Sequence, residues 1–179
     1  MRDVQPPPAR FRPPPSLWIC IFSVAIDIFS ISTVLPVVPF LALEFGASSF
    51  QLGIIYAGFG AAQALSMPII GSLSDRFGRK KLLVASLVGS GCGLMIQGFA
   101  PGLTVFIVGR VVAGSFGSSM PLAESFIGDV VPEPDQPRWH GILGAIVGMC
   151  FMFGPGIGAG LAQFHLQTPM KVCSVLAFT

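Results

Sequence analysis

The sequence predicts an all-α protein, a polytopic bundle of transmembrane helices. Of its 179 residues, 53% are hydrophobic and only 10% are charged, whereas a soluble domain usually carries about 25% charged residues. The apolar residues form five long runs, each close to the ~20 residues that a helix needs to cross a bilayer. Nearly all charges lie between these runs, which is the distribution expected of an integral membrane protein.

Three regions follow one another along the chain. Residues 1–16 form a proline-rich, basic tail, whose two Pro triplets exclude a helix and favour an extended conformation. We interpret this tail as a cytosolic lead-in, with an SH3-type ligand as the less favoured alternative. Residues 17–164 hold transmembrane helices 1 to 5, and residues 165–179 hold an outer loop and the start of a sixth helix that this sequence does not complete.

Apolar runs and turn residues set the expected helix boundaries. Pro36 and Pro39 predict a bend in the outer half of the first helix, because proline removes a backbone N–H and clashes with the preceding turn. A polar, proline-rich loop is expected at residues 128–139, between the fourth and fifth helices. The five helices themselves are expected at residues 17–43, 50–74, 82–100, 103–127 and 140–164.

The distribution of Lys and Arg predicts the orientation in the membrane. Cytoplasmic segments of membrane proteins carry an excess of these residues. With this segmentation one side receives only Lys171, while Arg110 lies inside a helix. The N-terminus is therefore predicted to be cytoplasmic, although the sequence does not indicate which membrane holds the protein. The cations on the cytoplasmic side are Arg2, Arg10, Arg12, Arg76, Arg79, Lys80, Lys81 and Arg138.

A charged turn between two apolar runs carries the most specific motif. The segment from Gly71 to Leu83 has the pattern G-x-L-x-D-R-x-G-R-K-x-x-L. It resembles the loop between helices 2 and 3 of the major facilitator superfamily of secondary transporters, with Ser74 where that loop usually has Ala. The resemblance predicts a cytoplasmic gating loop. Its residues here are Gly71, Asp75, Arg76, Gly78, Arg79 and Lys80.

Members of this superfamily have twelve helices in two six-helix halves around a site at the midplane of the membrane. The resemblance covers about residues 17–164. It therefore implies the N-terminal six-helix half of a major facilitator fold, with five complete helices plus the start of the sixth. The missing C-terminal half of the transporter is the expected partner.

Asp27 is the strongest candidate for a functional residue inside the membrane. It lies about ten residues into the first run, or about 15 Å, close to mid-bilayer. Ser23 and Ser30 share its helix face. A central Asp costs about 2.5–3.5 kcal/mol on insertion scales, so ionisable residues at this depth usually have a function. We favour proton binding by Asp27 over a purely structural pairing.

Arg110 is the second charge within a span. The stretch from Arg110 to Gly117 resembles the helix-4 motif R-x-x-x-G of the superfamily, which is linked to proton transfer in antiporters, although Ala113 replaces a frequent polar residue. The alternative is an arginine that snorkels to the outer interface. We predict that Arg110 is the partner or electrostatic counterweight of Asp27 across the bundle.

Two further side chains are predicted to face substrate. Tyr56 and Gln63 lie on one face of the second helix. For Gln63, substrate binding and a bridge between helices 1 and 2 are equally favoured.

The fifth helix carries a glycine-proline motif. Gly154-Pro155-Gly-Ile-Gly158-Ala resembles the helix-5 motif G-P-x-x-G-G of the antiporter branch, with Ala159 in place of the final Gly and Cys150 where Gly is usual. We predict a gating element, because proline frees a carbonyl and glycines allow close helix packing. Ordinary small-residue packing is the alternative.

Acidic residues near the charged turn suggest a latch. Asp129 and Arg138 resemble the D…P…R pattern after helix 4. Together with Asp75, Glu124 and the cations of the gating loop they are predicted to hold one access state. The alternative is a solvated cluster worth only about 0–1 kcal/mol per pair.

The remaining sequence offers no other chemistry. No phosphate-binding loop, metal-ligand spacing, cofactor motif or Ser-His-Asp set is present, and basic residues lie at membrane edges rather than in a nucleic-acid patch. We predict no enzyme, cofactor, metal or nucleic-acid partner. The favoured function is proton-coupled antiport of a small molecule, as in drug or tetracycline efflux. The alternatives are a sugar or organic-ion facilitator, and a non-transporting fragment that pairs with a full-length relative.

Overall fold

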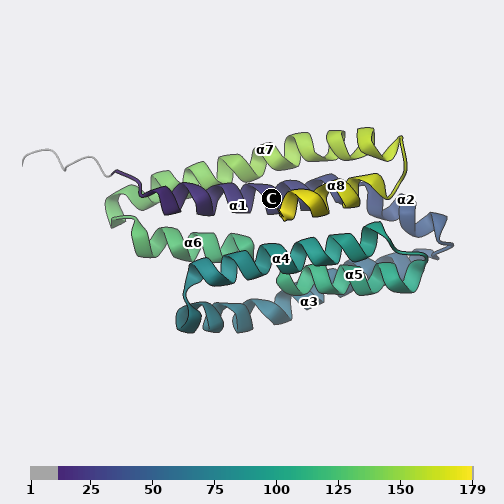
Figure 1. Cartoon of the computed structure of the whole chain (residues 1–179), viewed down its shortest axis with the longest axis horizontal. Coiled ribbons are helices and arrows are strands. Elements are labelled where there is room, and N and C mark those ends of the chain that lie inside the picture. The colour runs from purple at the N-terminus through teal and green to yellow at the C-terminus, as the bar shows by residue number, and fades with distance from the viewer. Residues whose placement is uncertain (1–11, 179) are drawn as a thin grey trace, which may run out of the picture.

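The computed structural model describes residues 12–178, so residues 1–11 of the predicted tail lie outside the described part. The regular structure of the described part is helical throughout, in an elongated bundle (Figure 1). Its elements are α1 Pro15–Val34, α2 Val37–Glu44, α3 Ser49–Phe77, α4 Arg79–Gly98, α5 Leu103–Phe116, α6 Ser119–Val130, a short 3-10 turn Glu133–Asp135, α7 Gln136–Ala162 and α8 Thr168–Ala177.

Five segments of the described chain are long and apolar enough to cross a membrane, which confirms the predicted fold class. Figure 1 shows α1 lying along α7, with α8 close to α1. Below them α4 packs on α5, and α5 packs on α3. The five candidate spans are Pro15–Val34, Ser49–Phe77, Arg79–Gly98, Leu103–Val130 and Glu133–Ala162.

The first predicted helix is interrupted where its prolines lie. Leu35 and Pro36 separate α1 from α2, which confirms the predicted bend. Pro39 has no N–H to offer to the carbonyl of Leu35 four residues earlier. The hydroxyl of Tyr56 donates to that carbonyl at 3.4 Å instead. A side chain of α3 thus satisfies a backbone group that proline leaves free.

The fourth predicted helix is not continuous, and in this respect the prediction was wrong. Pro121 cannot donate to the carbonyl of Gly117, so the helix breaks between α5 and α6. Gln63 Nε2 donates to the Gly117 carbonyl at 2.5 Å, and Ser86 Oγ donates to the Phe116 carbonyl. The break persists because side chains from α3 and α4 bind the freed carbonyls.

Two predicted loops are shorter than expected. The loop predicted at residues 128–139 is reduced because α6 extends to Val130 and α7 begins at Gln136, which places Arg138 in the first turn of α7. The charged turn is also mostly helical. Only Gly78 separates α3 from α4; its φ of 92° lies in the left-handed region that favours glycine. Gly71, predicted as part of the gating loop, lies within α3.

The core has two apolar clusters with a polar layer between them. One cluster lies at the α2 end of the bundle, around Leu41, Leu94 and Phe106, and the other lies at the opposite end, around Leu17 and Ile127. Buried polar side chains lie on α1, α4 and α5 and at the start of α6. The layer comprises Asp27, Ser30, Ser32, Thr33, Ser86, Ser90, Arg110, Ser118 and Ser119.

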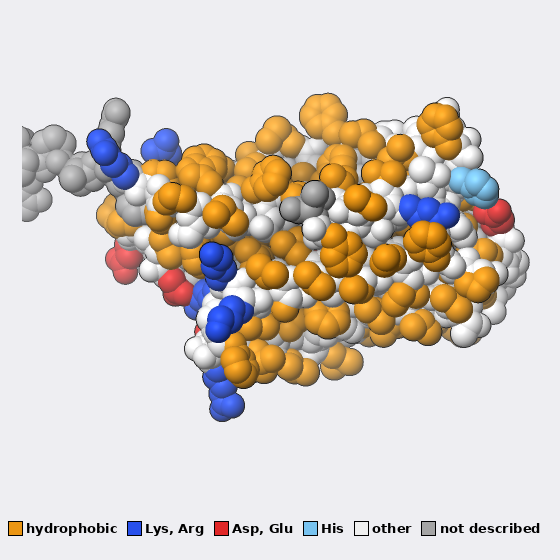
Figure 2. All heavy atoms as spheres, viewed as in Figure 1, with side chains coloured by type: hydrophobic (Ala, Val, Ile, Leu, Met, Phe, Trp, Pro, Cys, Tyr) orange, Lys and Arg blue, Asp and Glu red, His pale blue; other side chains and the backbone are white. Residues whose placement is uncertain are grey.

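The face shown in Figure 2 is apolar along the bundle, and most of its cations lie toward one end. Lys and Arg gather where the N-terminal segment leaves the bundle, while the flanks carry exposed apolar side chains. Helix α3 is the least covered, with only Ile55 and Ser74 buried along it. Such faces are suited to lipid or to another bundle of helices, not to water.

Candidate functional site

Asp27 ties three helices together in the polar layer. It lies on α1 and is 2% exposed. Ser90 Oγ of α4 donates to Asp27 Oδ1 at 2.8 Å, and Ser119 Oγ of α6 donates to Oδ2 at 2.5 Å. Each carboxylate oxygen thus has one hydroxyl donor. Sequence reasoning did not single out Ser90 or Ser119, although both are polar residues inside apolar runs.

The side chain of Arg110 packs against α3 and does not contact Asp27. Its guanidinium carbon is 5.3 Å from the ring centre of Phe59 and 6.0 Å from that of Tyr56. The side chain is 5% exposed, and within residues 12–178 its Nε and Nη2 have no hydrogen-bond partner. Cation–π contact is therefore the main interaction seen for this charge.

The predicted ion pair between Asp27 and Arg110 is not formed. Within residues 12–178, the two ion pairs found both involve Arg79. Serine hydroxyls occupy the carboxylate of Asp27, while aromatic rings of α3 hold the guanidinium of Arg110. Both charges belong to one polar layer but have separate partners.

Gln63 forms a bridge, but not the one considered from the sequence. Its amide joins α3 to the break between α5 and α6, so a bridge between helices 1 and 2 was wrong. Tyr56 is 39% exposed, with its hydroxyl on the Leu35 carbonyl and its ring near Arg110. These contacts give both residues a structural role.

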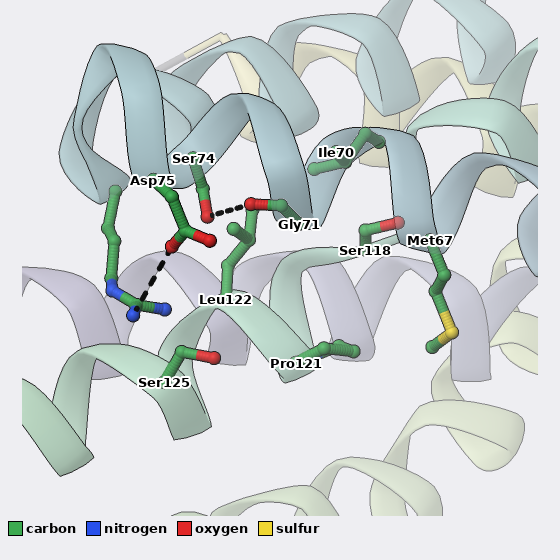
Figure 3. A pocket seen from close by; sticks show the side chains of 10 residues that line it. Met67, Ile70, Gly71, Ser74, Asp75, Ser118, Pro121, Leu122 and Ser125 are labelled. Carbon is green, nitrogen blue, oxygen red and sulfur yellow. Dashed lines mark hydrogen bonds and ion pairs between the residues drawn. The ribbon is translucent and has the colours of Figure 1, made fainter.

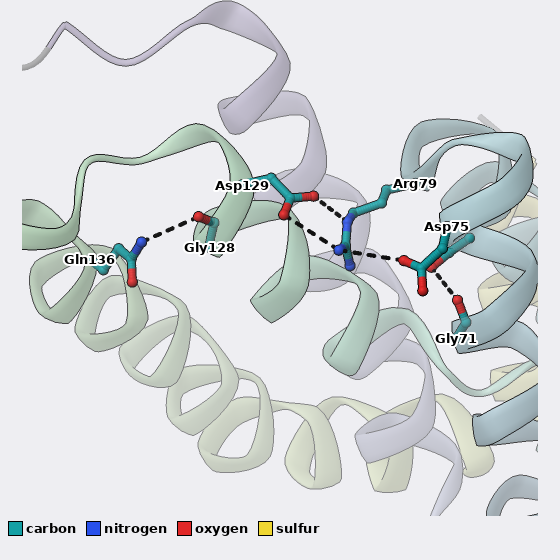
Figure 4. A network of polar contacts seen from close by, with 7 residues as sticks. Gly71, Asp75, Arg79, Gly128, Asp129 and Gln136 are labelled. Carbon is teal, nitrogen blue, oxygen red and sulfur yellow. Dashed lines mark hydrogen bonds and ion pairs between the residues drawn. The ribbon is translucent and has the colours of Figure 1, made fainter.

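Three residues form a charge network at the cationic end (Figure 4). Arg79, on the first turn of α4, lies 3.6 Å from Asp75 of α3. Its Nε and Nη2 both contact the carboxylate of Asp129 on α6, the latter at 3.4 Å. Both acids are well exposed: 69% of the Asp75 side chain and 55% of the Asp129 side chain are accessible to solvent. This network joins three helices through one arginine.

The other predicted members of the latch do not take part. Within the described part of the chain, no ion pair involves the remaining cations of the gating loop, the acid of α6 or the arginine of α7. These residues are Arg76, Lys80, Lys81, Glu124 and Arg138. The latch predicted from the sequence is thus limited here to Asp75, Arg79 and Asp129.

Arg79→Lys tests the bidentate contact of Arg79 with the carboxylate of Asp129. We expect a fall in stability of about 1 kcal/mol or less, because lysine keeps the charge but loses the two-pronged contact, and exposed pairs contribute little. For a chain of this size that corresponds to a melting temperature lower by about 2–4 °C at most. Arg76→Lys, at an exposed position with no ion pair among the described residues, is the control and should not shift the melting temperature.

The glycine-proline motif of α7 forms its contact with α1. A Cβ atom on Gly154 would meet Ser32 Oγ, and a Cβ on Gly158 would meet the carbonyl oxygen of Thr33. Ser32 Oγ also donates to the Cys150 carbonyl at 2.9 Å. The glycines therefore permit a backbone approach that no other residue allows.

Comparison with known proteins gives the family. The family model described as Major Facilitator Superfamily matches residues 17–179. This chain belongs to the major facilitator superfamily. Among curated proteins, it is 32% identical over 164 residues to the tetracycline resistance protein, class C, of Escherichia coli, covering 90% of this chain and 41% of that protein.

Two other curated relatives match with similar identity and coverage. The class H tetracycline resistance protein of Pasteurella multocida is 30% identical over 163 residues, covering 89% of this chain and 41% of that protein. The quinolone resistance protein NorA of Staphylococcus aureus (strain MRSA252) is 27% identical over 161 residues, covering 89% and 42%. The chain thus spans about two fifths of the length of the curated relatives it matches.

A solved structure supports the fold independently of sequence identity. The human organic anion transporter MFSD10 (TETRAN) superposes with a TM-score of 0.71 at 17% identity. The match covers 93% of this chain and 47% of that chain. The fold of this bundle therefore corresponds to about half of that chain.

Proposed function

We propose that this chain belongs to a proton-coupled antiporter that exports a small molecule. The observation that carries the proposal is Asp27, an ionisable group buried mid-bundle between α1, α4 and α6. Intramembrane acids of this kind are typical of proton relays in transporters. The names of the relatives, tetracycline and quinolone resistance proteins, support drug-like cargo.

The two hydroxyls on Asp27 suit a group that gains and loses a proton. A serine hydroxyl donates to a carboxylate, and it can rotate to accept from a protonated carboxyl group. Ser90 and Ser119 can therefore satisfy Asp27 in either state without moving a helix.

We further propose that the end of the bundle bearing Arg79 faces the cytoplasm. Arg12, Arg76, Lys80 and Lys81 belong to the same end as Arg79, because they lie just before α1, at the end of α3 and at the start of α4. The charge asymmetry of membrane proteins assigns such an end to the cytoplasm. Lys171 begins α8 at the opposite end, where its ammonium group lies 4.8 Å from the ring centre of Phe99. The N-terminus would then be cytoplasmic.

A second six-helix half is the proposed partner of this bundle. The chain covers 41% of its tetracycline-resistance relatives, and the open faces of α3 and α7 carry glycines with no neighbour within 4 Å. Examples are Gly53, Gly60, Gly144 and Gly148. Another bundle can approach such faces closely. The alternative, a non-transporting fragment, predicts co-purification with a longer relative and no transport.

Asp27→Asn is the direct test of proton coupling. In vesicles from cells that express the complete gene, accumulation of a fluorescent drug driven by a pH gradient should fall by at least about tenfold. Asn fits the same space and bonds to both serines, so the protein level should be unchanged. Glu124→Gln, the same change at an exposed site of α6, is the control. Accumulation retained in Asp27→Asn would refute the coupling role.

A facilitator of organic anions is the second candidate. It is favoured by Arg110, whose Nε and Nη2 have no partner within residues 12–178 and so can bind an anionic group. A facilitator would exchange labelled anion at equal pH on both sides of the membrane. It would also keep this exchange in Asp27→Asn and lose it in Arg110→Met.

A further inference from the structure

A polar cavity lies between α3 and α6 (Figure 3). Its volume is about 200 Å³. Asp75 and Arg79 line one end, and Figure 3 shows Met67 at the other. The hydroxyl-bearing residues Ser74 and Ser125 line it between these ends. Liquid water fills about 30 Å³ per molecule, so the cavity has room for about six.

Ser118 connects this cavity to Asp27. It lines the cavity, is 2% exposed, and its hydroxyl oxygen has no hydrogen-bond partner among the described residues. A buried hydroxyl left unpaired is unfavourable, and a cavity this polar normally holds water that supplies the missing partner. The next residue, Ser119, donates to Asp27 Oδ2 at 2.5 Å.

We propose that this cavity is a hydrated path by which Asp27 exchanges protons with solvent at the Arg79 end of the bundle. Water bound to Ser118 would lie beside Ser119, the next residue in the chain, whose hydroxyl bonds Asp27. The ion pair of Arg79 with Asp75 lies at one end of the cavity, and water can enter there because the Asp75 side chain is mostly exposed. The inference rests on the proposed proton coupling. It adds that Asp27 exchanges its proton with solvent on the side of the membrane that Arg79 faces.

The proton transfer balances through one serine. Ser119 does not itself line the cavity, so water bound to Ser118 relays a proton from the cavity to Ser119 Oγ while the hydroxyl proton of Ser119 moves to Asp27 Oδ2. The serine ends unchanged, the cavity water is left neutral and the carboxylate becomes a carboxylic acid. The reverse step returns the proton to the same solvent. No oxidant, reductant or further reactant is needed.

Cysteine labelling tests whether the cavity is hydrated. Cys92, the exposed cysteine among the four native ones, is first replaced by serine. Ser118→Cys should then react with a membrane-impermeant methanethiosulfonate cation at least about tenfold faster than Ala123→Cys. Ala123 lies on α6, the helix that Ser118 caps, but is fully buried in an apolar cluster. Labelling should occur only from the Arg79 side, and equal rates at both positions would refute the proposal.

A blocking variant tests whether the cavity serves Asp27. Ser125→Leu fills the cavity from a half-buried position, and Ser115→Leu is the control at a half-buried serine of α5 outside it. Infrared spectroscopy in acidic deuterated buffer follows deuteration of the carboxyl band that Asp27→Asn removes. Ser125→Leu should slow this exchange by about tenfold, and Ser115→Leu should leave it unchanged.

The outcomes separate this inference from the proposed function. If Ser118→Cys reacts but Ser125→Leu leaves deuteration of Asp27 unchanged, water fills the cavity without serving Asp27 and the inference is wrong. If both arms behave as expected while Asp27→Asn keeps gradient-driven accumulation, the hydrated path stands and proton coupling fails.

Discussion

Gly158→Ala is expected to lower the melting temperature more than any other single methyl added to α7. The new Cβ would meet the Thr33 carbonyl oxygen of α1, which is backbone and cannot rotate away. Overpacking of this kind costs about 1–3 kcal/mol. For a chain of this size the melting temperature should fall by about 2–12 °C, at about 2–4 °C per kcal/mol. Size-exclusion chromatography of heated, detergent-solubilised protein measures the shift.

Gly156→Ala is the matched control two residues away. A Cβ on Gly156 has nothing within 4 Å, so the same chemical change adds no clash. Alanine also favours a helix over glycine by about 0.5–1 kcal/mol, so the control should be neutral or slightly stabilised. If both variants melt alike, α1 and α7 do not make this close contact in the folded protein.

The membrane spans and the bend at Pro36 could be predicted because each depends on local sequence. Hydropathy sets which segments enter a bilayer, and proline at positions 36 and 39 removes N–H groups wherever the helix lies. The break after Phe116 has the same local cause in Pro121, yet it was missed. The sequence alone does not show that Gln63 and Ser86, distant in the chain, receive the freed carbonyls.

The depth of the two intramembrane charges could be predicted, but their partners could not. Counting residues places Asp27 near mid-bilayer and Arg110 inside a span. The donors to Asp27 are 63 and 92 residues away, and which of many serines they are depends on how each helix is rotated in the bundle. Their opposite charges suggested an ion pair. In the structure, serine hydroxyls bond to Asp27 and aromatic rings of α3 contact Arg110.

For the charged turn, too, the sequence predicted the type of site but not all of its contacts. Its motif indicated a cytoplasmic end and named Asp75 and Arg79 correctly as members of a network. The number of residues that join the network depends on where α4 and α7 begin. Because both helices start earlier than predicted, Lys80 and Arg138 lie on helical first turns and form no ion pair within residues 12–178.

Arg110→Met is expected to raise the melting temperature while abolishing transport. An arginine costs about 2.5–3.5 kcal/mol at the centre of a span on insertion scales, and Arg110 lies in the first third of its span. Here no acid pairs with it among the described residues, and two of its nitrogens have no partner. Methionine has a similar length and packs on the rings of Phe59 and Tyr56 without that cost. We expect a gain of about 1–3 kcal/mol, seen as a rise of about 2–12 °C.

Arg110→Lys separates charge from packing in this prediction. Lysine keeps the positive charge but lacks the planar group that stacks on an aromatic ring, so it should give no gain in stability. A rise in melting temperature with methionine but not lysine would mean that Arg110 is retained for its charge, at the expense of stability. A fall with methionine would contradict this account, because it would require an anionic partner for Arg110 in the assembled protein whose loss outweighs the desolvation of the charge.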